Sequence, residues 1–492
     1  MAELMIRSTR LVRLDPELPD HPVDIRIRDG RISEIGTGLG GAEQTIEADG
    51  RWLSPGFWDY HVHFRQWAVM GLRFDTGAAR CPEQVCQVVA EQVARSSEPA
   101  SLLVGFGHRT SSWQRPVSAA ELDAVSGAHP VVLITGDAHS GWINTAAQRL
   151  LAAATAGVWS EGEWFALMNR LDRLQADPQL MAEAVDQRLR QAARLGVVAM
   201  VDLVMDGSLG GWREVSAAGS VMPRIRVGVT PQALDEVEAA GYRDGDLLDQ
   251  RGLVTMGPLK LICDGSLSSL TAYCHAPYGP HRSCGLLTYP AEELTALVRR
   301  GHRAGLQIAC HAIGDAAATA VLDAFERVGA SGSIEHAQLM SPDQIARMAR
   351  LGLAASVQPA HLVDDLEALE RLWADRADRA FPLRDLLAAG VTLRLGSDAP
   401  IAPLDPLAAM AAAVHRNLAG RPTWHPEQRL SVAEALAASV NGARVRVGAP
   451  ADLVLLDADP LAVSDDSAAA VALQRLRPVS ATIVAGEVIH QA

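Results

Sequence analysis

The chain has 492 residues, of which 48% are apolar and 21% charged, and its formal net charge is −14. This length exceeds one ordinary core, so we expect one large domain with a smaller one, or two to three modest domains. The composition is typical of a soluble globular protein. The negative charge and the absence of any run of five basic residues argue against nucleic acid or an anionic membrane as partner.

The two ends of the chain share one kind of pattern. Residues 1–54 and 441–492 contain alternating, turn-punctuated strand patterns, such as DIRIRDGRISEIG and ADLVLLDADPL, with no helical pattern between them. We expect the two ends to pair into a small composite β-sandwich. The first residues lack the basic and then apolar build of a secretory signal, and no stretch reaches 18 apolar residues, so a cytoplasmic location is expected.

Residues 55–440 alternate short β-rich runs with helical patterns, which predicts repeated βα units and a parallel sheet. One run lies near residue 60 and seven follow residue 196. In chain order the runs are PGFWDYHVHF, GVVAMVDLV, RIRVGVT, GPLKLICDG, LQIACHAIG, GSIEHAQ, LAASVQPAH and VTLRLGSDAP. Eight strands are the number that closes a barrel, so we predict an α/β fold with a (β/α)8 TIM barrel.

The segments between these runs have the spacing of amphipathic helices. SPDQIARMARLG begins with Ser341 as a candidate N-cap and Pro342 in the first turn, and it stops at Gly352. Residues 64–190 interrupt the rhythm after the first strand and are too long for one connecting helix. We therefore expect an insertion there, with strands and helices of its own, covering the mouth of the barrel.

Polar residues gather where the predicted barrel strands end. His61 and His63 are two residues apart on the first strand, so their side chains share one face. Further along the chain come Lys260, His311, His336 and Asp398. A single histidine is more often a hydrogen-bonded structural residue than a ligand. Here, however, six such residues lie at the C-terminal ends of the strands, where active sites of barrels are found. Together they predict a metal site with N and O ligands.

Lys260 is the only lysine among the 44 basic residues of the chain. A neutral lysine amine can take up carbon dioxide to form a carbamate, whose two oxygens can bridge two cations about 3.5–4 Å apart. Arginine stays protonated and cannot do this. The alternative is an accident of an arginine-rich composition. Because a charged amine within PLKLIC would be costly to bury without a purpose, we favour a functional role.

Six cysteines without a CxxC pair favour reduced thiols. The segment from Cys274 to Cys284 holds two cysteines and two histidines, so a zinc clip is considered there. Its spacing matches no common structural zinc site, and a surface loop rich in proline and glycine is the preferred interpretation.

Eight strings of the chain resemble one protein family. They are PGFWDYHVHF, GDAHSGWINTAA, KLICDGSL, CHAIGDAA, IEHAQL, SVQPAH, LGSDAPIAPLDP and ADLVLLD. Over nearly the whole length the chain is similar to the amidohydrolase superfamily, and within it to the amidohydrolase family 3 branch of N-substituted formamide deformylase type. The resemblance implies a (β/α)8 barrel with a composite β-sandwich, a binuclear metal centre and a homodimer.

The resemblance also implies roles for individual residues. His61 and His63 would bind the more buried ion with Asp398, while His311 and His336 would bind the outer one. Carboxylated Lys260 and a hydroxide would bridge the two divalent ions, with zinc expected and manganese, iron and cobalt left open. His139 and His361 resemble positions that face the substrate, although a structural role is an equal alternative. Asp264 and Asp315 are expected to fix loop turns.

The chemistry of these residues indicates hydrolysis of a small molecule. Two cations lower the pKa of a shared water, and one polarises the substrate carbonyl. Asp398 then passes a proton to the leaving nitrogen. An amide or formamide C–N bond is the expected target of the metal-bound hydroxide. The alternatives are a single-metal deaminase or esterase of the same superfamily and a noncatalytic binding protein on this fold.

Overall fold

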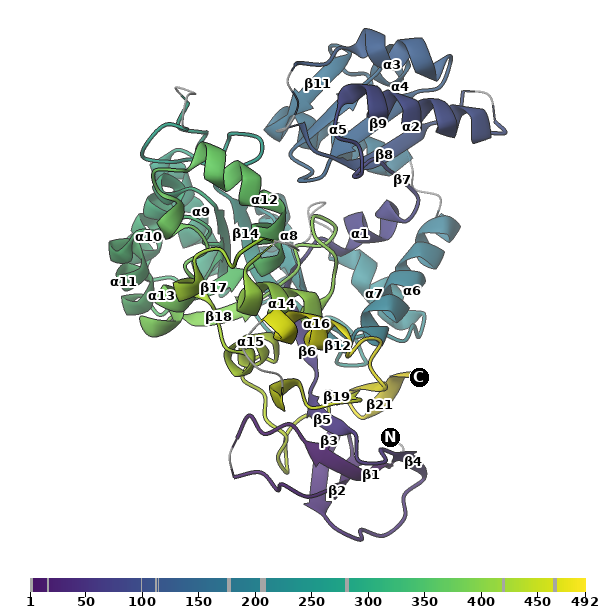
Figure 1. Ribbon diagram of the computed structural model, residues 1–492, viewed down its shortest axis with the longest axis vertical. Helices are drawn as coiled ribbons and strands as arrows, with labels where there is room; N and C mark the ends of the chain where they lie inside the picture. The colour runs from purple at the N-terminus through teal and green to yellow at the C-terminus, as the bar shows by residue number, and fades with distance from the viewer. Residues whose placement is uncertain are drawn as a thin grey trace.

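Three β-sheets organise the protein (Figure 1). A sheet built from both ends of the chain lies at the bottom of the view, the barrel lies in the middle, and a five-stranded sheet lies at the top. The computed structural model describes residues 3–15, 17–98, 100–110, 113, 115–174, 178–203, 209–278, 283–417, 421–462 and 467–492.

Eight parallel strands form the central barrel, and each predicted run covers one of them wholly or in part. The strands are β6 (Phe57–Val62), β12 (Val197–Asp202), β13 (Arg224–Val229), β14 (Val254–Ile262), β15 (Ile308–Ala312), β16 (Gly332–His336), β17 (Ala354–Val357) and β18 (Thr392–Leu395). They pair in chain order from β6 to β18. A parallel bridge between Val62 and Ala399 joins the last strand region to the first, so the predicted (β/α)8 class is confirmed.

Helices cover the outside of the barrel, and every residue of β12 and β15 is buried. Ser341 caps the helix after β16 as predicted, because its side chain accepts a hydrogen bond from the Gln344 N–H in a capping box. The barrel helices are α7 (Gly210–Ala217), α8 (Leu234–Ala240), α9 (Ala291–Arg303), α10 (Asp315–Val328), α11 (Pro342–Arg350), α12 (Pro359–Leu372), α13 (Leu383–Ala388), α14 (Pro406–His415), α15 (Val432–Ser439) and α16 (Ser467–Gln474). In the described residues, none of the helices combines the length and apolarity that a membrane span needs.

The predicted insertion carries a sheet of its own, ordered β11-β10-β9-β8-β7. Its strands are β7 (Phe74–Asp75), β8 (Leu103–His108), β9 (Val131–Thr135), β10 (Ser140–Ile143) and β11 (Gly157–Ser160). Its helices are α2 (Pro82–Arg95), α3 (Ala119–Ser126), α4 (Thr145–Leu151) and α5 (Glu161–Leu174). The flanking helices α1 (Phe64–Met70) and α6 (Pro178–Arg194) instead pack on each other and lie beside the barrel (Figure 1).

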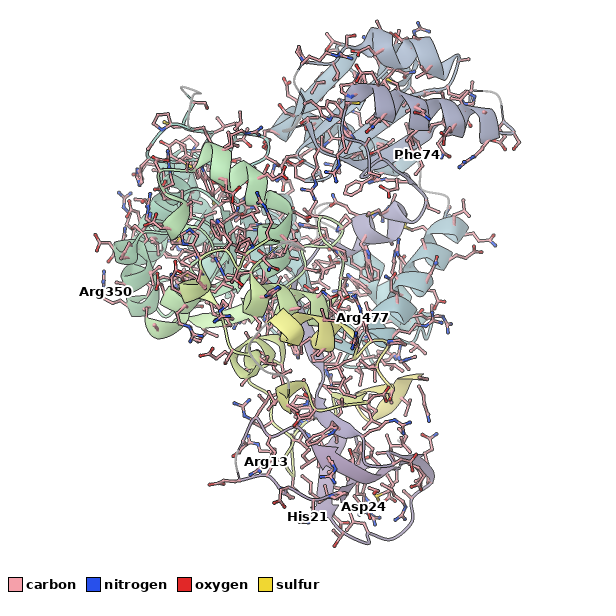
Figure 2. All side chains as sticks on the ribbon, in the orientation of Figure 1. Arg13, His21, Asp24, Phe74, Arg350 and Arg477 are labelled. Atoms are coloured by element: carbon pink, nitrogen blue, oxygen red, sulfur yellow. The ribbon has the colours of Figure 1, made fainter. Side chains whose placement is uncertain are left out.

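The sheet of the chain ends joins five N-terminal strands to three C-terminal strands, which confirms the composite sandwich. The strands are β1 (Leu4–Leu11), β2 (Val23–Arg28), β3 (Arg31–Gly36), β4 (Gln44–Glu47), β5 (Trp52–Pro55), β19 (Leu453–Leu456), β20 (Ala481–Val484) and β21 (Glu487–Gln491). β1 bends at Ser8, whose φ is +52°, and Asp24 fixes the bend by accepting the Ser8 N–H at 3.0 Å. Asp24 is labelled in this sheet in Figure 2. Leu4 and Leu453 share one core there. The division at residues 54 and 440 remains our proposal.

Candidate metal centre

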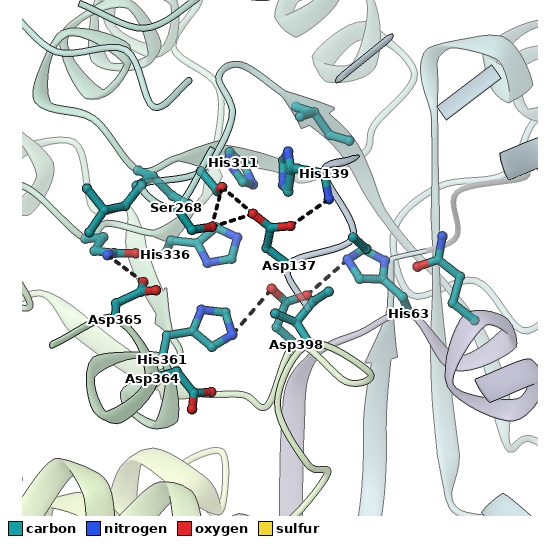
Figure 3. A pocket seen from close by; sticks show the side chains of 18 of the residues that line it. His63, Asp137, His139, Ser268, His311, His336, His361, Asp364, Asp365 and Asp398 are labelled. Atoms are coloured by element: carbon teal, nitrogen blue, oxygen red, sulfur yellow. Dashed lines mark hydrogen bonds and ion pairs between the residues drawn. The ribbon is translucent and has the colours of Figure 1, made fainter. Parts of the chain in front are cut away.

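The six predicted ligands meet at the C-terminal end of the barrel. Figure 3 shows four of them: His63, His311, His336 and Asp398. Five of them line a solvent-open cavity of about 850 Å³, together with His139 and His361. The sixth, His61, is fully buried beneath the cavity, with its Nε2 3.2 Å from Lys260 Nζ. The insertion supplies Asp137, Ala138, His139, Phe165 and Met168 to the lining, which places it over the mouth as expected.

His61 is oriented by a buried carboxylate. Its Nδ1 lies 2.8 Å from Glu335 Oε2 on β16. Because a carboxylate only accepts hydrogen bonds, Nδ1 carries the proton in the neutral ring. The lone pair of Nε2 is then free to accept from Lys260 Nζ at 3.2 Å, and Asp398 Oδ1 lies 3.5 Å away. Glu335 was missed by the sequence analysis, although it directly precedes His336 in the string IEH.

His63 is oriented in the same way by a backbone group. Its Nδ1 lies 2.9 Å from the carbonyl oxygen of Leu203, which can only accept a hydrogen bond. In the neutral ring Nε2 therefore turns its lone pair toward Asp398 Oδ1 at 3.1 Å. Lone pairs of two imidazoles thus converge on one carboxylate oxygen. This arrangement is unfavourable alone and is what a divalent cation requires of N and O ligands.

The backbone around Asp398 is held in a sparsely populated conformation. Asp398 has φ +61° and His336 has φ +70°, although neither is a glycine. Such strained residues persist only where the surroundings over-determine them, and they cluster at functional sites. The Asp398 N–H donates to the His61 carbonyl at 2.6 Å, which fixes the carboxylate beside the histidine pair. A Cβ at Gly396 would lie 2.7 Å from His61 N, so only glycine permits this approach.

Several buried polar atoms of the rim are left unsatisfied. Within the described residues, His336 Nδ1, His361 Nε2 and Asp398 Oδ1 have no hydrogen-bond partner. Ligand atoms of His61, His336 and Asp398 all lie within 4.8 Å of one another. The His311 ring lies 4.4 Å from that of His336, measured between centroids. Because buried polar groups are normally paired, these orphan atoms fit a bound cation.

The electrostatics of the rim favour ligand forms that can bind metal. Burial lowers the pKa of His61, His311 and His336 well below the ordinary value, and neighbouring cationic groups lower it further. Burial also lowers the pKa of Lys260, although nearby carboxylates oppose the shift. Burial would raise the pKa of Asp398, but its contact with His63 and positive charge on His63, His361 and Lys260 together outweigh that effect, and the net shift is downward. Neutral imidazoles and an ionised carboxylate are the forms that bind metal.

The two histidines predicted to face the substrate lie on opposite sides of the cavity. His361, on α12, has its Nε2 3.7 Å from Asp398 Oδ2. His139 follows β9 in the insertion, and its ring centroid is 6.0 Å from that of His311. Its Nδ1 lies 3.1 Å from Glu161 Oε2. Glu161 was also missed, because nothing in its local sequence marks it as a partner of a histidine 22 residues earlier.

Asp264 holds loops as predicted. It accepts backbone N–H groups of Tyr273, Ile313 and Gly314 at 2.8–3.1 Å. Burial raises its pKa to about 7. Asp315 likewise accepts the His275 N–H at 2.9 Å. These bonds tie the loop after β14 to the end of β15.

The alternative zinc clip falls partly on residues 279–282, which lie outside the described residues and include His281. Of its other members, Cys274 is buried and His275 lies 3.0 Å from the Thr319 hydroxyl through Nε2. The segment does contain a loop, and no metal-binding group including Cys274 is found among the described residues.

A (β/α)8 barrel with histidine, aspartate and lysine side chains at its C-terminal rim defines the class of metal-dependent barrel hydrolases. The model of the Amidohydrolase family matches residues 44–490, and the chain belongs to this family.

Two curated proteins and one solved structure illustrate the similarity. Protein LONG AFTER FAR-RED 3 of Arabidopsis thaliana is 29% identical over 90% of this chain and 83% of its own length. N-substituted formamide deformylase of Arthrobacter pascens is 26% identical over 89% of this chain and 90% of its own. The crystal structure of an uncharacterized metal-dependent hydrolase from Pyrococcus horikoshii OT3 has a TM-score of 0.79 and 24% identity, covering 94% of this chain and 99% of that one. That structure supports the fold.

Proposed function

We propose that this hydrolase cleaves a C–N bond in a small molecule of the amide or formamide type. The observation that carries the proposal is the convergence of His61, His63 and Asp398, whose acceptor atoms face one another in a buried site. Similarity to an N-substituted formamide deformylase supports the choice of bond.

We propose that the residues of the rim hold a centre of two divalent ions, and zinc is the metal we expect. Those that would hold the ions are His61, His63, Lys260, His311, His336 and Asp398. When bound, such ions lower the pKa of a water molecule and polarise a carbonyl oxygen. The chain itself supplies the neutral imidazoles and the carboxylate, and the Glu335 carboxylate and the carbonyls of Leu203 and His61 orient them.

Lys260 has the environment that carboxylation needs. It is 2% exposed, and its lowered pKa favours the neutral amine. In our proposal this amine attacks carbon dioxide, so that an N–C bond forms and one amine proton leaves to solvent. The product is an anionic carbamate with two oxygens. Arginine cannot react in this way because its guanidinium remains protonated.

Asp398 is the residue that we propose to move the proton. Its Oδ1 faces the two histidines of β6, while its Oδ2 faces the cavity near His361. The carboxylate would take a proton from the attacking water and return it to the leaving nitrogen. General acid and base catalysis of this kind contributes about 10²- to 10⁴-fold in rate.

The rest of the cavity selects and shelters the substrate. Phe165 and Met168 of the insertion face Ile313 and Ile401 of the barrel around the polar rim. Apolar walls of this kind would contact an apolar substituent on the amide. His139 and His361 would orient the substrate carbonyl between these walls.

A single-ion enzyme is the second candidate, and one observation favours it. Ligand atoms from His61, His336 and Asp398 already lie within 4.8 Å of one another, which is the arrangement for one ion. A single ion would suit a deaminase or esterase of the same superfamily. Metal analysis separates the two, because two ions per chain support the binuclear centre and one ion supports the alternative.

The proposed function is tested by a hydrolysis screen of N-formyl, N-acyl and cyclic amide compounds with metal-reconstituted protein, alongside Lys260→Arg. We expect the variant to lose most activity and to bind less metal, because the bridging carbamate cannot form. Arg299→Lys, on the exposed face of α9, is the matched control and should behave as wild type. Full metal content and full turnover in Lys260→Arg would refute the proposal.

A further inference from the structure

A carboxylate and an imidazole of the insertion form a pair at the edge of the cavity. Glu161 is the first residue of α5, and its Oε2 lies 3.1 Å from His139 Nδ1. His139 lines the cavity, and its side chain is 14% exposed. Among the described residues, Glu161 is the only hydrogen-bond partner of the ring, so Nε2 is the nitrogen left for a ligand.

Both members of the pair are held firmly. Glu161 Oε1 accepts hydrogen bonds from the Thr271 hydroxyl at 2.6 Å and from the Ser269 hydroxyl at 3.3 Å. These hydroxyls belong to the loop that follows β14, the strand of Lys260. The barrel therefore fixes the carboxylate that the insertion provides.

The backbone of His139 is fixed from its other side. Asp137 Oδ1 accepts the His139 N–H at 3.1 Å, and Asp137 Oδ2 accepts the Ser266 hydroxyl at 2.9 Å (Figure 3). The start of α5 is anchored by Trp164, which is fully buried and donates to the Ala138 carbonyl at 3.0 Å. The imidazole thus has little freedom to turn.

We infer that Glu161 is a positioning residue, which holds His139 so that Nε2 contacts the substrate. This inference rests on the proposed function for the identity of that substrate, an N-substituted amide or formamide. Glu161 itself touches no reacting atom in this account. It acts by keeping the proton of His139 on Nδ1 and the ring in one orientation, as carboxylates do for catalytic and metal-binding histidines.

The hydrogen bonds around Glu161 predict what its amide would do. Thr271 and Ser269 both donate to Oε1, so Glu161→Gln should keep its carbonyl oxygen toward these hydroxyls. Its NH₂ group would then point at His139 Nδ1 and donate to it. The proton of the neutral ring would have to move to Nε2. Glu161→Gln, which keeps the size of the side chain, should therefore move the ring proton of His139 from Nδ1 to Nε2 without disturbing the packing.

The test uses the full-length, metal-reconstituted protein with ¹⁵N-labelled histidine. The ring resonances of His139 are assigned by their loss in His139→Gln. Burial would lower the pKa of His139, but Glu161 and Asp137 outweigh it and raise the pKa, so spectra are recorded at alkaline pH, where the ring is neutral. There we expect the proton on Nδ1 in the wild type and on Nε2 in Glu161→Gln. This readout needs no substrate, so it remains valid if amide hydrolysis is not the activity. Identical His139 ring shifts in both proteins would overturn the inference.

Kinetics supply the second measurement, with 4-nitroformanilide as the probe. We expect Glu161→Gln to lower kcat/KM by about 10- to 100-fold, the usual cost of removing the partner of a functional histidine, with unchanged metal content. Glu163→Gln changes an exposed carboxylate in the same first turn of α5 and should match the wild type. Equal kcat/KM in Glu161→Gln and Glu163→Gln would overturn the inference. If the wild type hydrolyses neither this probe nor any compound of the amide screen, the proposed function fails and the NMR result alone decides the inference.

Discussion

The rim of the barrel and the insertion above it place their functional side chains in different ways. On the rim, His63 and Asp398 are fixed by backbone groups at strand ends, the carbonyls of Leu203 and His61, while Glu335 from the neighbouring strand orients the His61 ring. In the insertion, His139 is fixed by bonds between side chains that cross to the barrel, through Glu161 and Thr271.

This difference suggests that the rim binds metal and that the insertion selects the substrate. Backbone placement repeats from strand to strand, so it suits a metal centre whose geometry must be kept. Placement by side-chain networks changes with a few substitutions, so it suits the part of the site that selects a substrate. We expect damage to the rim to remove metal and catalysis together, and damage to the insertion to spare the metal.

The largest effect is expected at the rim, from Asp398→Asn. The amide cannot take the proton from the attacking water, so kcat should fall by about 10²- to 10⁴-fold in steady-state assays. Asp343→Asn, on an exposed position of α11, is the matched control. A kcat within twofold of wild type in Asp398→Asn would remove this residue from the mechanism.

Glu335→Gln tests whether the carboxylate that orients His61 contributes to metal affinity. The amide no longer requires the proton of His61 on Nδ1, so the lone pair of Nε2 is no longer secured. We expect metal affinity to fall by about 10- to 100-fold in titrations with a competing chelator. Glu293→Gln, at an exposed position of α9, should leave the affinity unchanged. Unchanged affinity in Glu335→Gln would contradict the role of this carboxylate.

Alanine substitutions at Gly396 on the rim and at Gly141 in the insertion compare the effects of the two regions on metal binding. Alanine at Gly396 would press on the His61 backbone, whereas alanine at Gly141 would overlap the ring of Trp164 in the insertion. Each change should cost roughly 1–3 kcal/mol of folding free energy, seen as a lower Tm. Only Gly396→Ala should also lower the metal content measured by elemental analysis. Equal metal loss in both variants would argue against separate roles.

The smallest effect is expected from Ser341→Ala on the outer surface of the barrel. Losing the bond from the Gln344 N–H to the serine hydroxyl should cost about 1 kcal/mol. Tm should fall slightly, while metal content and kcat should stay as in the wild type. A loss of metal in this variant would show that the rim responds to any destabilisation of the barrel.

The difference between backbone and side-chain placement also explains which parts of the site could be predicted from the sequence. The eight strands repeat a recognisable pattern, and His61, His63, His311 and His336 fall at the ends of such strands, so both the barrel and the convergence of its polar residues were predictable. Lys260 stood out by composition. The placement of Asp398 additionally needs a left-handed backbone and a glycine two residues before it, which no periodicity reveals.

For the insertion, the sequence predicted only that residues 64–190 interrupt the βα pattern with strands and helices of their own. Glu161 meets His139 because Trp164 packs against Gly141 and because a loop of the barrel supplies hydroxyls, and both conditions arise only from tertiary packing. Helix α1 falls within residues 64–190 and α6 begins there and ends at Arg194. Both lie beside the barrel, and amphipathic spacing does not tell which surface a helix covers. The local sequence pattern therefore predicted the barrel and the polar residues of its rim, but not the carboxylates Glu161 and Glu335 that contact its histidines.

We propose that Lys260 serves the metal centre as an anion. This is tested by a crystal structure of the metal-loaded protein with anomalous scattering recorded at the absorption edge of the metal. We expect two anomalous peaks among His61, His63, His311, His336 and Asp398, with electron density for a carboxyl group extending from Lys260 Nζ to both. Full metal occupancy beside a bare Lys260 amine would contradict it.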